Sequence, residues 1–520
     1  MKLLDDFAWT DSGNAERLVA LHGADLRHVT TWGKWLAFDG KRWLHDEGAT
    51  FRAAKATARA MLRDASSIDS DDRRKQAISF ATRSESHTSI RSMVALARHE
   101  AAVAIRPEQL DADRMLLNVE NGTIDLRTGE LRKHRRDDHM TRLAPVAYGA
   151  EATAPTWDAF LTRSMGDSAE LVEFLQRMVG YSLTGEIREH VLAFFFGAGA
   201  NGKSTFLSTV HSALGDYATP APRGLLFRAR GERHPTELAS LHGRRFVTCS
   251  EVEEGQTFDE ALTKDLTGGD PIECRRMRED FWSFAPTHKL FLAGNHKPTV
   301  RGDDEGIWRR MRLVPWLVTI PENERDVRLG EKLRAELPGV LAWAVRGCLA
   351  WQAKGLAAPE AVKVATAKYR EENDALGEFL RLHVVFEPAA TVARKELRER
   401  YEGFCKENGD QPFGAKRFAG RLRESGVTER KVRTAGGSRD GWAGVRLATE
   451  AEQATVQAWG TRGDVVTSGD QFPDSSRKAQ INAQTENHSP QVATPPRGDD
   501  SGSQAPFADW LGDEGIGGAK

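Results

Sequence analysis

The strongest constraint on the fold is an apolar run that leads directly into a glycine-rich loop. Val191 to Phe196 is continuously apolar, as expected of a buried strand. The next eight residues, 197–204, read Gly-Ala-Gly-Ala-Asn-Gly-Lys-Ser, which is the pattern GxxxxGKS. The residues from Thr205 to Val210 suit a helix whose amino end faces the loop. A strand, a tight loop and a helix in this order predict an α/β fold with a phosphate-binding loop.

Each part of this loop predicts contact with a nucleoside triphosphate such as ATP. The glycines let the backbone curl so that its N–H groups point at the phosphates. Lys203 is expected to reach the β- and γ-phosphates, and the Ser204 hydroxyl to bind Mg²⁺. A glycine-rich hairpin without a ligand is the alternative. The expected nucleotide-contacting residues are Gly197, Ala198, Gly199, Ala200, Asn201, Gly202, Lys203, Ser204 and Thr205.

Composition narrows the class of protein. The chain has 520 residues, of which 40% are hydrophobic, and a formal net charge of −2. Several domains with real cores are therefore expected, and any basic site for nucleic acid must be local. The four cysteines lie far apart, which argues against a disulfide framework or cysteine zinc site and for a reducing compartment. Without a signal peptide or a membrane-length apolar run, we expect a cytoplasmic protein with no membrane partner.

Apolar spacing predicts other local elements along the chain. It indicates a β-hairpin over 32–43 and helices over 53–61, 91–104 and 157–183. Strand-like and helix-like segments alternate over 190–320, as they do in α/β domains.

A second strand is expected to deliver acids beside the loop. The apolar segment Arg245 to Ser250 ends at Glu251, and Glu253 lies two residues further on the same face. A carboxylate at this strand end would hold Mg²⁺ directly or through water. A solvated acidic loop after an edge strand is the alternative.

A third strand adds an amide, and a later segment adds paired arginines. The strand from Lys289 to Gly294 ends at Asn295, whose side chain can bond a γ-phosphate or the attacking water. Arg309 and Arg310 follow in the chain and suit an arginine finger that acts on a neighbouring subunit's nucleotide. Taken alone, an ordinary turn and a solvated basic face explain these residues better.

In this order the elements resemble superfamily 3 helicases, specifically the phage and plasmid primase–helicase family related to the poxvirus helicase-primase. The resemblance extends beyond the loop to the opening segment 10–18 and to segments 118–131, 215–218, 266–276 and 295–298. It covers residues 8 to 447.

The resemblance implies roles for particular residues. Lys203 and Ser204 would bind phosphate and Mg²⁺, Asn295 would be the sensor, and either of the two arginines would be the finger. The second motif departs from the family, because many members carry adjacent acids where this chain reads Ser-Glu-Val-Glu. Which glutamate is the main metal ligand therefore stays open. The implied catalytic residues are Lys203, Glu251, Glu253, Asn295, Arg309 and Arg310.

The resemblance also implies a DNA-contacting hairpin between Thr267 and Phe281. A ring of subunits must grip one strand through its backbone charges without reading bases. Phe281 and Trp282 would stack on bases or pack in the core. The implied phosphate contacts are Arg275, Arg276 and Arg278.

We expect an α/β chain built around an AAA+-like ATPase core with a phosphate-binding loop. An α+β family-specific pre-helicase region (1–150) and a helical collar-like segment (151–189) precede that core (190–383). A winged-helix module (384–448) and a disordered tail (449–520) follow it. The module's basic residues fit phosphate contact, and a solvated helix face is the alternative. They are Lys416, Arg417, Arg421, Arg423, Arg430, Lys431 and Arg433.

These features lead to an expected function. We expect an ATP-driven DNA helicase of a phage or mobile element that forms a homo-hexamer on single-stranded or forked DNA. Because the resemblance begins near residue 8, we expect no priming activity and a separate primase or polymerase partner. One alternative is an origin-binding initiator that uses ATP as an assembly switch. Another is an unrelated phosphate-loop kinase, which needs neither a trans arginine nor a DNA hairpin.

Overall fold

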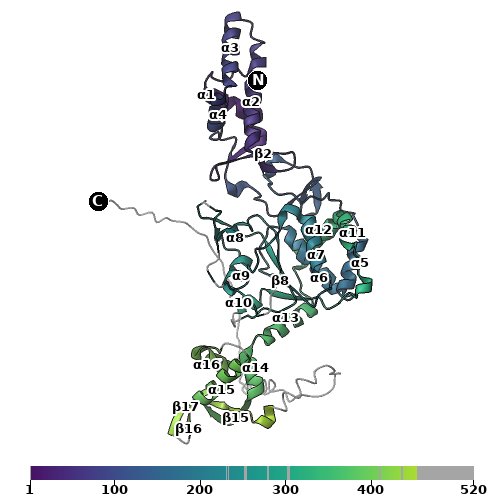
Figure 1. Ribbon diagram of the computed structural model, residues 1–520, viewed down its shortest axis with the longest axis vertical. Helices are drawn as coiled ribbons and strands as arrows, with labels where there is room; N and C mark the ends of the chain where they lie inside the picture. Colours follow the sequence, from purple (N-terminus) through teal and green to yellow (C-terminus); the bar gives the residue numbers. More distant parts are fainter. Residues whose placement is uncertain are drawn as a thin grey trace, which may run out of the picture. The chain divides into compact units, whose positions relative to one another are not determined.

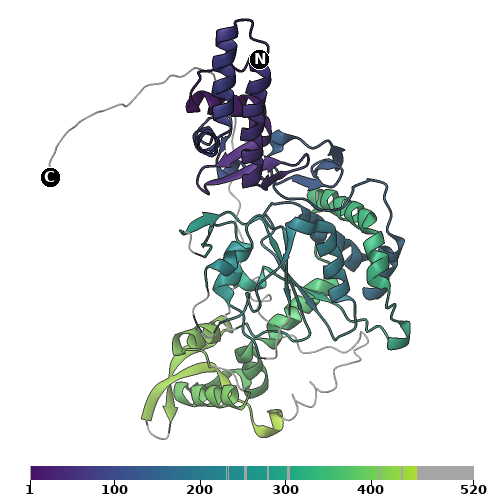
Figure 2. The ribbon, with the colours of Figure 1, turned by 45° about the horizontal axis from the view of Figure 1, so that its top comes forward.

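A computed structural model of the chain describes residues 2–453, with short gaps. The gaps are 230, 232–233, 251–254, 278–279, 301–304, 409–411 and 435–436. The chain divides into two units, residues 1–448 and 449–520. The tail expected to be disordered lies outside the described residues from position 454 onward. The first unit carries the fold and is drawn from two directions in Figures 1 and 2.

The amino-terminal region combines helices with a small mixed sheet in the order β3-β2-β1-β4. The hairpin expected over 32–43 is present, because β2 and β3 pair antiparallel across a glycine with positive φ, Gly40. The helices are α1 (Asp11–His22), α2 (Glu47–Ala65), α3 (Asp71–Ser84) and α4 (His87–Ala97). The strands are β1 (Leu26–Val29), β2 (Lys34–Phe38), β3 (Trp43–His45) and β4 (Ala104–Ile105).

Two of the expected helices end differently from the prediction. The helix expected over 91–104 ends at Ala97, and Ala104 belongs to a strand that pairs with β1. The helix expected over 157–183 is two helices, α5 (Pro155–Ser164) and α6 (Ala169–Leu183). The break falls at Gly166 and Asp167, which both have a φ of +61° and so cannot continue a right-handed helix.

A second sheet, β5-β6-β7, is antiparallel and precedes these two helices. The buried amide of Asn118 in this sheet donates to two backbone carbonyls, of Lys41 and Arg142, both at 3.0 Å. These hydrogen bonds fix the sheet to one segment that precedes it in the sequence and to one that follows it. Its strands are Leu116–Val119, Gly122–Asp125 and Glu130–Arg132.

The centre of the unit is a fully parallel sheet in the order β14-β8-β13-β10-β9. β8 is the first of these strands in the sequence. It has a neighbouring strand on each side, so its backbone groups are paired along its length. The strands are β8 (Leu192–Phe196), β9 (Ala218–Pro220), β10 (Phe246–Ser250), β13 (Lys289–Gly294) and β14 (Met311–Pro315). The alternating α/β pattern expected over 190–320 is confirmed in this parallel sheet.

Helices cover both faces of the parallel sheet (Figure 1). Alternate residues of β8 belong to two different hydrophobic cores, one on each face. Ala193 and Phe195 pack with helices α5, α6, α7 and α12. Leu192 and Phe194 pack with residues of α9, α10 and α13. A strand covered on both faces explains why residues 191–196 are apolar without alternation. The helices not yet bounded are α7 (Lys203–Leu214), α8 (Thr236–Ala239), α9 (Glu260–Thr267), α10 (Glu305–Trp308), α11 (Leu329–Ala335), α12 (Leu337–Lys354) and α13 (Glu360–Glu372).

Beyond α13, the chain forms a module of helices and a three-stranded antiparallel sheet, β15-β17-β16. Its core joins Phe379, Tyr401, Phe418 and Trp442. The elements are α14 (Ala375–His383), β15 (Val384–Ala393), α15 (Arg394–Glu407), α16 (Ala415–Glu424), β16 (Thr428–Thr434) and β17 (Gly437–Leu447). Among the helices in the described residues, none is both long and apolar enough to cross a bilayer.

The close packing of α6 against α12 depends on two glycines. A Cβ at Gly180 would lie 2.1 Å from the backbone nitrogen of Cys348, and a Cβ at Gly347 would lie 2.1 Å from the carbonyl oxygen of Gln176. Both obstacles are backbone atoms, so a side chain at either position forces the helices apart.

We expect Gly180→Ala to lower the free energy of unfolding by about 1–3 kcal/mol or more, because overpacking displaces whole helices. The matched control is Gly403→Ala in α15, where an added Cβ meets nothing within 4 Å. That change should raise stability by about 0.5–1 kcal/mol. Urea unfolding of both variants checks this, and equal midpoints would contradict the packing argument.

Candidate functional site

The predicted loop follows β8 and ends at α7, and two of its glycines are required by their surroundings. A Cβ at Gly197 would lie 2.0 Å from the carbonyl oxygen of Trp316. Gly202 has a φ of +92°, and a Cβ there would lie 2.8 Å from the ring of Phe160. Ala200 also has positive φ, at +59°. The backbone therefore curls tightly between strand and helix, as the sequence pattern predicted.

The amine of Lys203 is buried at the centre of this loop, and the residue is only 6% exposed. Its Nζ donates to the carbonyl oxygens of Gly197 at 2.7 Å and Ala198 at 3.2 Å. It also lies 3.2 Å from Oδ1 of Asn201 and 3.1 Å from Oδ1 of Asn295. Burial lowers the pKa of Lys203 from its usual value. The cation thus has neutral oxygens around it and no carboxylate among these hydrogen-bond partners.

Asn201 joins the loop to a distant strand end. Its Nδ2 donates to the carbonyl oxygen of Trp316 at 3.0 Å and to that of Ala198. Its Oδ1 accepts from Lys203. The sequence predicted Asn201 only as one of several loop residues, because Trp316 is 115 positions away. A polar residue between two glycines of the loop was the one available signal.

Asn295 lies at the carboxyl edge of the sheet, as expected. Gly294, the last residue of β13, pairs with Phe196, so Asn295 comes level with the start of the loop. Its side chain is exposed on one side and bonds Lys203 on the other. Glu251 and Glu253, the expected acids after β10, lie outside the described residues. Within the described part, no group of three His, Cys, Asp or Glu side chains could hold a metal.

The amino end of α7 is open to an anion. Its N-cap is Gly202, which has no side chain to cap the first turn, and the backbone N–H of Lys203 lies 3.5 Å from Oδ1 of Asn201. Ser204 is exposed in that turn, and Thr205 follows it, partly buried. Uncapped N–H groups at a helix start attract negative charge, because the helix dipole is positive there. The residues that the structure brings together are therefore the loop, Lys203 and Asn295.

Arg309 and Arg310 lie at the opposite edge of the sheet and differ from each other. Arg310 immediately precedes β14, and its carbonyl accepts from the backbone N–H of Leu192 at 2.9 Å. Its guanidinium bonds Thr267 Oγ1 at 3.1 Å and the Gly306 carbonyl at 2.8 Å. Arg309 is exposed, and its guanidinium makes no hydrogen bond or ion pair with any residue in the described ranges.

The backbone of Arg309 is nevertheless fixed. Its N–H donates to the Glu305 carbonyl at 3.0 Å, and its own carbonyl accepts from Nη1 of Arg312 at 2.7 Å. An exposed cation on a fixed backbone suits contact with another molecule better than the tied guanidinium of Arg310 does.

A hairpin is present in the expected region, but its second strand begins one residue beyond the expected end at Phe281. In it, β11 (Ile272–Cys274) pairs antiparallel with β12 (Trp282–Phe284). Between the strands, Arg275 lies over the Phe281 ring at 5.1 Å and Arg276 over the Trp282 ring at 5.5 Å. Phe281 is 55% exposed and Met277 76% exposed. Arg278 lies outside the described residues. The turn therefore combines two cations with an exposed aromatic ring.

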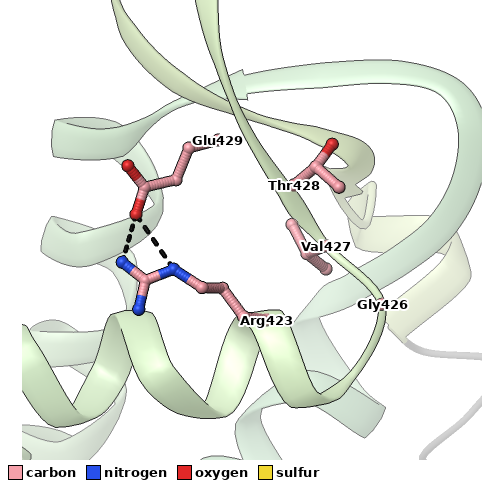
Figure 3. A pocket seen from close by; sticks show the side chains of 5 residues that line it. All are labelled: Arg423, Gly426, Val427, Thr428 and Glu429. Carbon is pink, nitrogen blue, oxygen red and sulfur yellow. Dashed lines mark hydrogen bonds and ion pairs between the residues drawn. The ribbon is translucent and has the colours of Figure 1, made fainter.

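In the carboxyl-terminal module, two of the basic residues are paired within the chain. Arg421 bonds Asp374 at 2.6 Å. Figure 3 shows Nε and Nη2 of Arg423 directed at one carboxylate oxygen of Glu429, with an Nε distance of 3.2 Å. A shallow hollow of about 430 Å³ is lined by Arg423, Glu429, Gly426, Val427 and Thr428. It contains none of the expected nucleotide-site residues.

Comparison with known proteins identifies two family segments. Residues 15–166 match the family described as D5 N terminal like, and residues 195–310 match a family of unknown function, DUF5906. The second match contains the loop, Lys203 and the hairpin. The chain is 27% identical over 294 residues to "Putative helicase L207/L206" of Acanthamoeba polyphaga mimivirus, covering 52% of this chain and 30% of the relative.

Two further relatives come from other large DNA viruses. "Putative helicase 184R" of Invertebrate iridescent virus 6 is 24% identical, covering 44% of this chain and 25% of the relative. "Putative primase C962R" of African swine fever virus is 24% identical, covering 39% and 22%. The resemblance to the primase–helicase family is confirmed. The alignments span less than a third of each of these relatives' own length.

Solved structures of the NrS-1 C terminal region also align with this chain. The apo structure of its residues 305–718 aligns with a TM-score of 0.43 and 10% identity. That alignment covers 83% of this chain and 99% of the other.

We expect Asn201→Ala to lower the free energy of unfolding by about 1–3 kcal/mol, because it removes the donor to two carbonyls beside a buried amine. The matched control is Asn295→Ala, which removes the other amide on Lys203 but at an exposed position. That change should cost less than about 0.5 kcal/mol. Chemical denaturation measures both, and equal losses would contradict the anchoring role of Asn201.

Proposed function

We propose that this protein is an ATP-driven, ring-forming DNA helicase in the replication of a phage or related mobile element. The observation that carries the proposal is that the candidate catalytic side chains lie at two opposite edges of one parallel sheet. Lys203 and Asn295 meet at the carboxyl edge, and Arg309 is exposed at the amino edge. In this interpretation the sheet is an AAA+-like ATPase core and the carboxyl-terminal module is a winged helix.

The carboxyl edge fits a nucleoside triphosphate. The loop has Gly197 and Gly202 at obligatory positions, and together with the start of α7 and the buried amine of Lys203 it forms a cationic site. Ser204 and Glu251, with Glu253 as the alternative acid, are the residues that would hold Mg²⁺. The metal would neutralise phosphate charge as it develops. Lys203 would exchange its carbonyl partners for phosphate oxygens, and Asn295 would orient the γ-phosphate or the attacking water.

The amino edge supports action of Arg309 on a neighbouring subunit. β14 begins level with Leu192, whereas the loop begins after Phe196, four residues further along β8. At about 3.3 Å per residue, this places the edges about 13 Å apart. Arg309 is therefore poorly placed for its own loop and is free to complete the site of a second copy. We propose Arg309 as the finger, within a homo-hexamer.

The hairpin supports single-stranded or forked DNA as the partner. Arg275 and Arg276 supply phosphate contacts, as we propose for Arg278, and the exposed ring of Phe281 offers a surface for base stacking. Such contacts bind any sequence, which suits translocation. A partner primase or polymerase is part of the proposal. Strand displacement on forked DNA separates it from an initiator that uses ATP only for assembly.

We expect Lys203→Ala to reduce ATP hydrolysis and unwinding of a forked duplex by at least about a hundredfold, because the amine neutralises charge in the transition state. The matched control is Lys332→Ala. Lys332 is an exposed lysine on α11 that pairs with Asp326, and this variant should keep both activities. Circular dichroism confirms that each variant is folded. Near-normal hydrolysis by folded Lys203→Ala protein would reject the nucleotide site.

We expect Arg309→Ala to be inactive alone and to recover part of its ATPase activity when mixed with Lys203→Ala. Some interfaces then pair an intact loop with an intact arginine, and a finger typically contributes about a thousandfold or more. The control mixture is Arg309→Ala with the double variant Lys203→Ala/Arg309→Ala, which contains no intact finger. Absence of rescue in subunits shown to co-assemble would contradict action in trans.

A further inference from the structure

Arg310 is built into a chain of contacts that leads to the hairpin. Its Nε donates to Oγ1 of Thr267 at 3.1 Å, and its Nη1 donates to the Gly306 carbonyl at 2.8 Å. Thr267 is the last residue of α9, and the segment after it leads directly to β11. The guanidinium therefore links the residue beside Arg309 to the base of the hairpin.

Thr267 is the fixed point of this link, and it is only 4% exposed. Its hydroxyl donates to the carbonyl of Thr263 at 2.6 Å, which leaves the oxygen lone pairs to accept from Arg310. Its own carbonyl lies 3.1 Å from Nδ1 of His190, just before β8. Both hydrogen bonds of the hydroxyl are thus satisfied together, and the end of α9 is held against the start of the sheet.

The other end of the link is equally constrained. The carbonyl of Arg310 accepts from Leu192, and its N–H donates to the Ile307 carbonyl at 3.1 Å. Arg309 is the next residue along this backbone, and Arg312 holds its carbonyl. A displacement of Thr267 that pulls on the Arg310 side chain would therefore reach Arg309 through one peptide unit.

We propose that the Arg310–Thr267 hydrogen bond couples DNA on the hairpin to the position of Arg309. Arg310 is then a positioning residue, and Arg309 is the group that touches the neighbour's nucleotide. The coupling rests on the proposed helicase function. It makes DNA-stimulated hydrolysis depend on a hydroxyl that contacts neither DNA nor ATP.

The test is the ratio of the ATPase kcat with saturating single-stranded DNA to the kcat without DNA. This ratio does not change with the fraction of folded enzyme, because inactive protein lowers both rates equally. Thr267→Val removes the acceptor at nearly constant volume and should reduce the ratio by about fivefold or more, the usual range of a coupling energy. Thr267→Ser keeps the hydroxyl and should keep the ratio.

Thr263→Val is the matched control, because that hydroxyl lies one turn earlier in α9 and donates within the helix to the Asp259 carbonyl, at 2.7 Å. It should leave the ratio unchanged. Arg310→Met removes the donor from the other side and should lower the ratio as Thr267→Val does. The double variant should be no worse than either single one, because both remove the same bond.

The possible outcomes distinguish failure of the proposed coupling from failure of the proposed helicase function. A wild-type protein whose hydrolysis does not respond to DNA would overturn the proposed helicase function. A responsive wild type with equally responsive Thr267→Val and Arg310→Met variants would overturn the coupling alone. Additive losses in the double variant would also overturn it. If Thr267→Val does not fold, Arg310→Met against wild type decides the question.

Discussion

The parallel register of β8 with its two neighbours is the constraint on which the candidate site depends. β8 pairs with β13 so that Asn295 follows level with the loop, and with β14 so that Arg310 lies level with the start of the strand. The alternation of its side chains between two cores holds this register, because a slip of one residue would exchange both faces. The apolar strand β8 therefore keeps Asn295 and Arg310 at opposite edges of the sheet.

The parts predicted from sequence are those encoded locally. The loop and the strands β8, β10 and β13 could be predicted because contiguous apolar residues lead into distinctive polar ends. Helix α3 was not foreseen, because most of its residues are exposed and its apolar pattern is weak. The local pattern predicts a helix at the strand residue Ala104, because its partner His28 is far away in sequence. The break at Gly166 was missed, although a glycine beside an aspartate permits positive φ.

In the candidate site, too, the sequence predicts the locally encoded features and not those that depend on distant residues. Lys203 and Asn295 follow directly from their strand ends, and their contact at 3.1 Å agrees with that expectation. The sequence could not separate Arg309 from Arg310, because the two residues are chemically identical neighbours. Their difference arises from Thr267, which lies 43 positions away from Arg310. The bond from Asn201 to Trp316 is likewise a product of the folded sheet.

The surroundings of Lys203 have a consequence for proton exchange. Among the described residues, its hydrogen-bond partners are carbonyl and amide oxygens, and burial lowers its pKa. Phosphate oxygens in the loop would raise that pKa again, because an adjacent anion favours the charged amine. Between the pKa of the free protein and the higher pKa of the complex, binding of an anion would therefore be coupled to uptake of a proton. Below that range, the amine is already charged and binding is independent of protons. If the loop binds phosphate as proposed, its affinity for the anion would fall as the pH rises above the lower of the two pKa values.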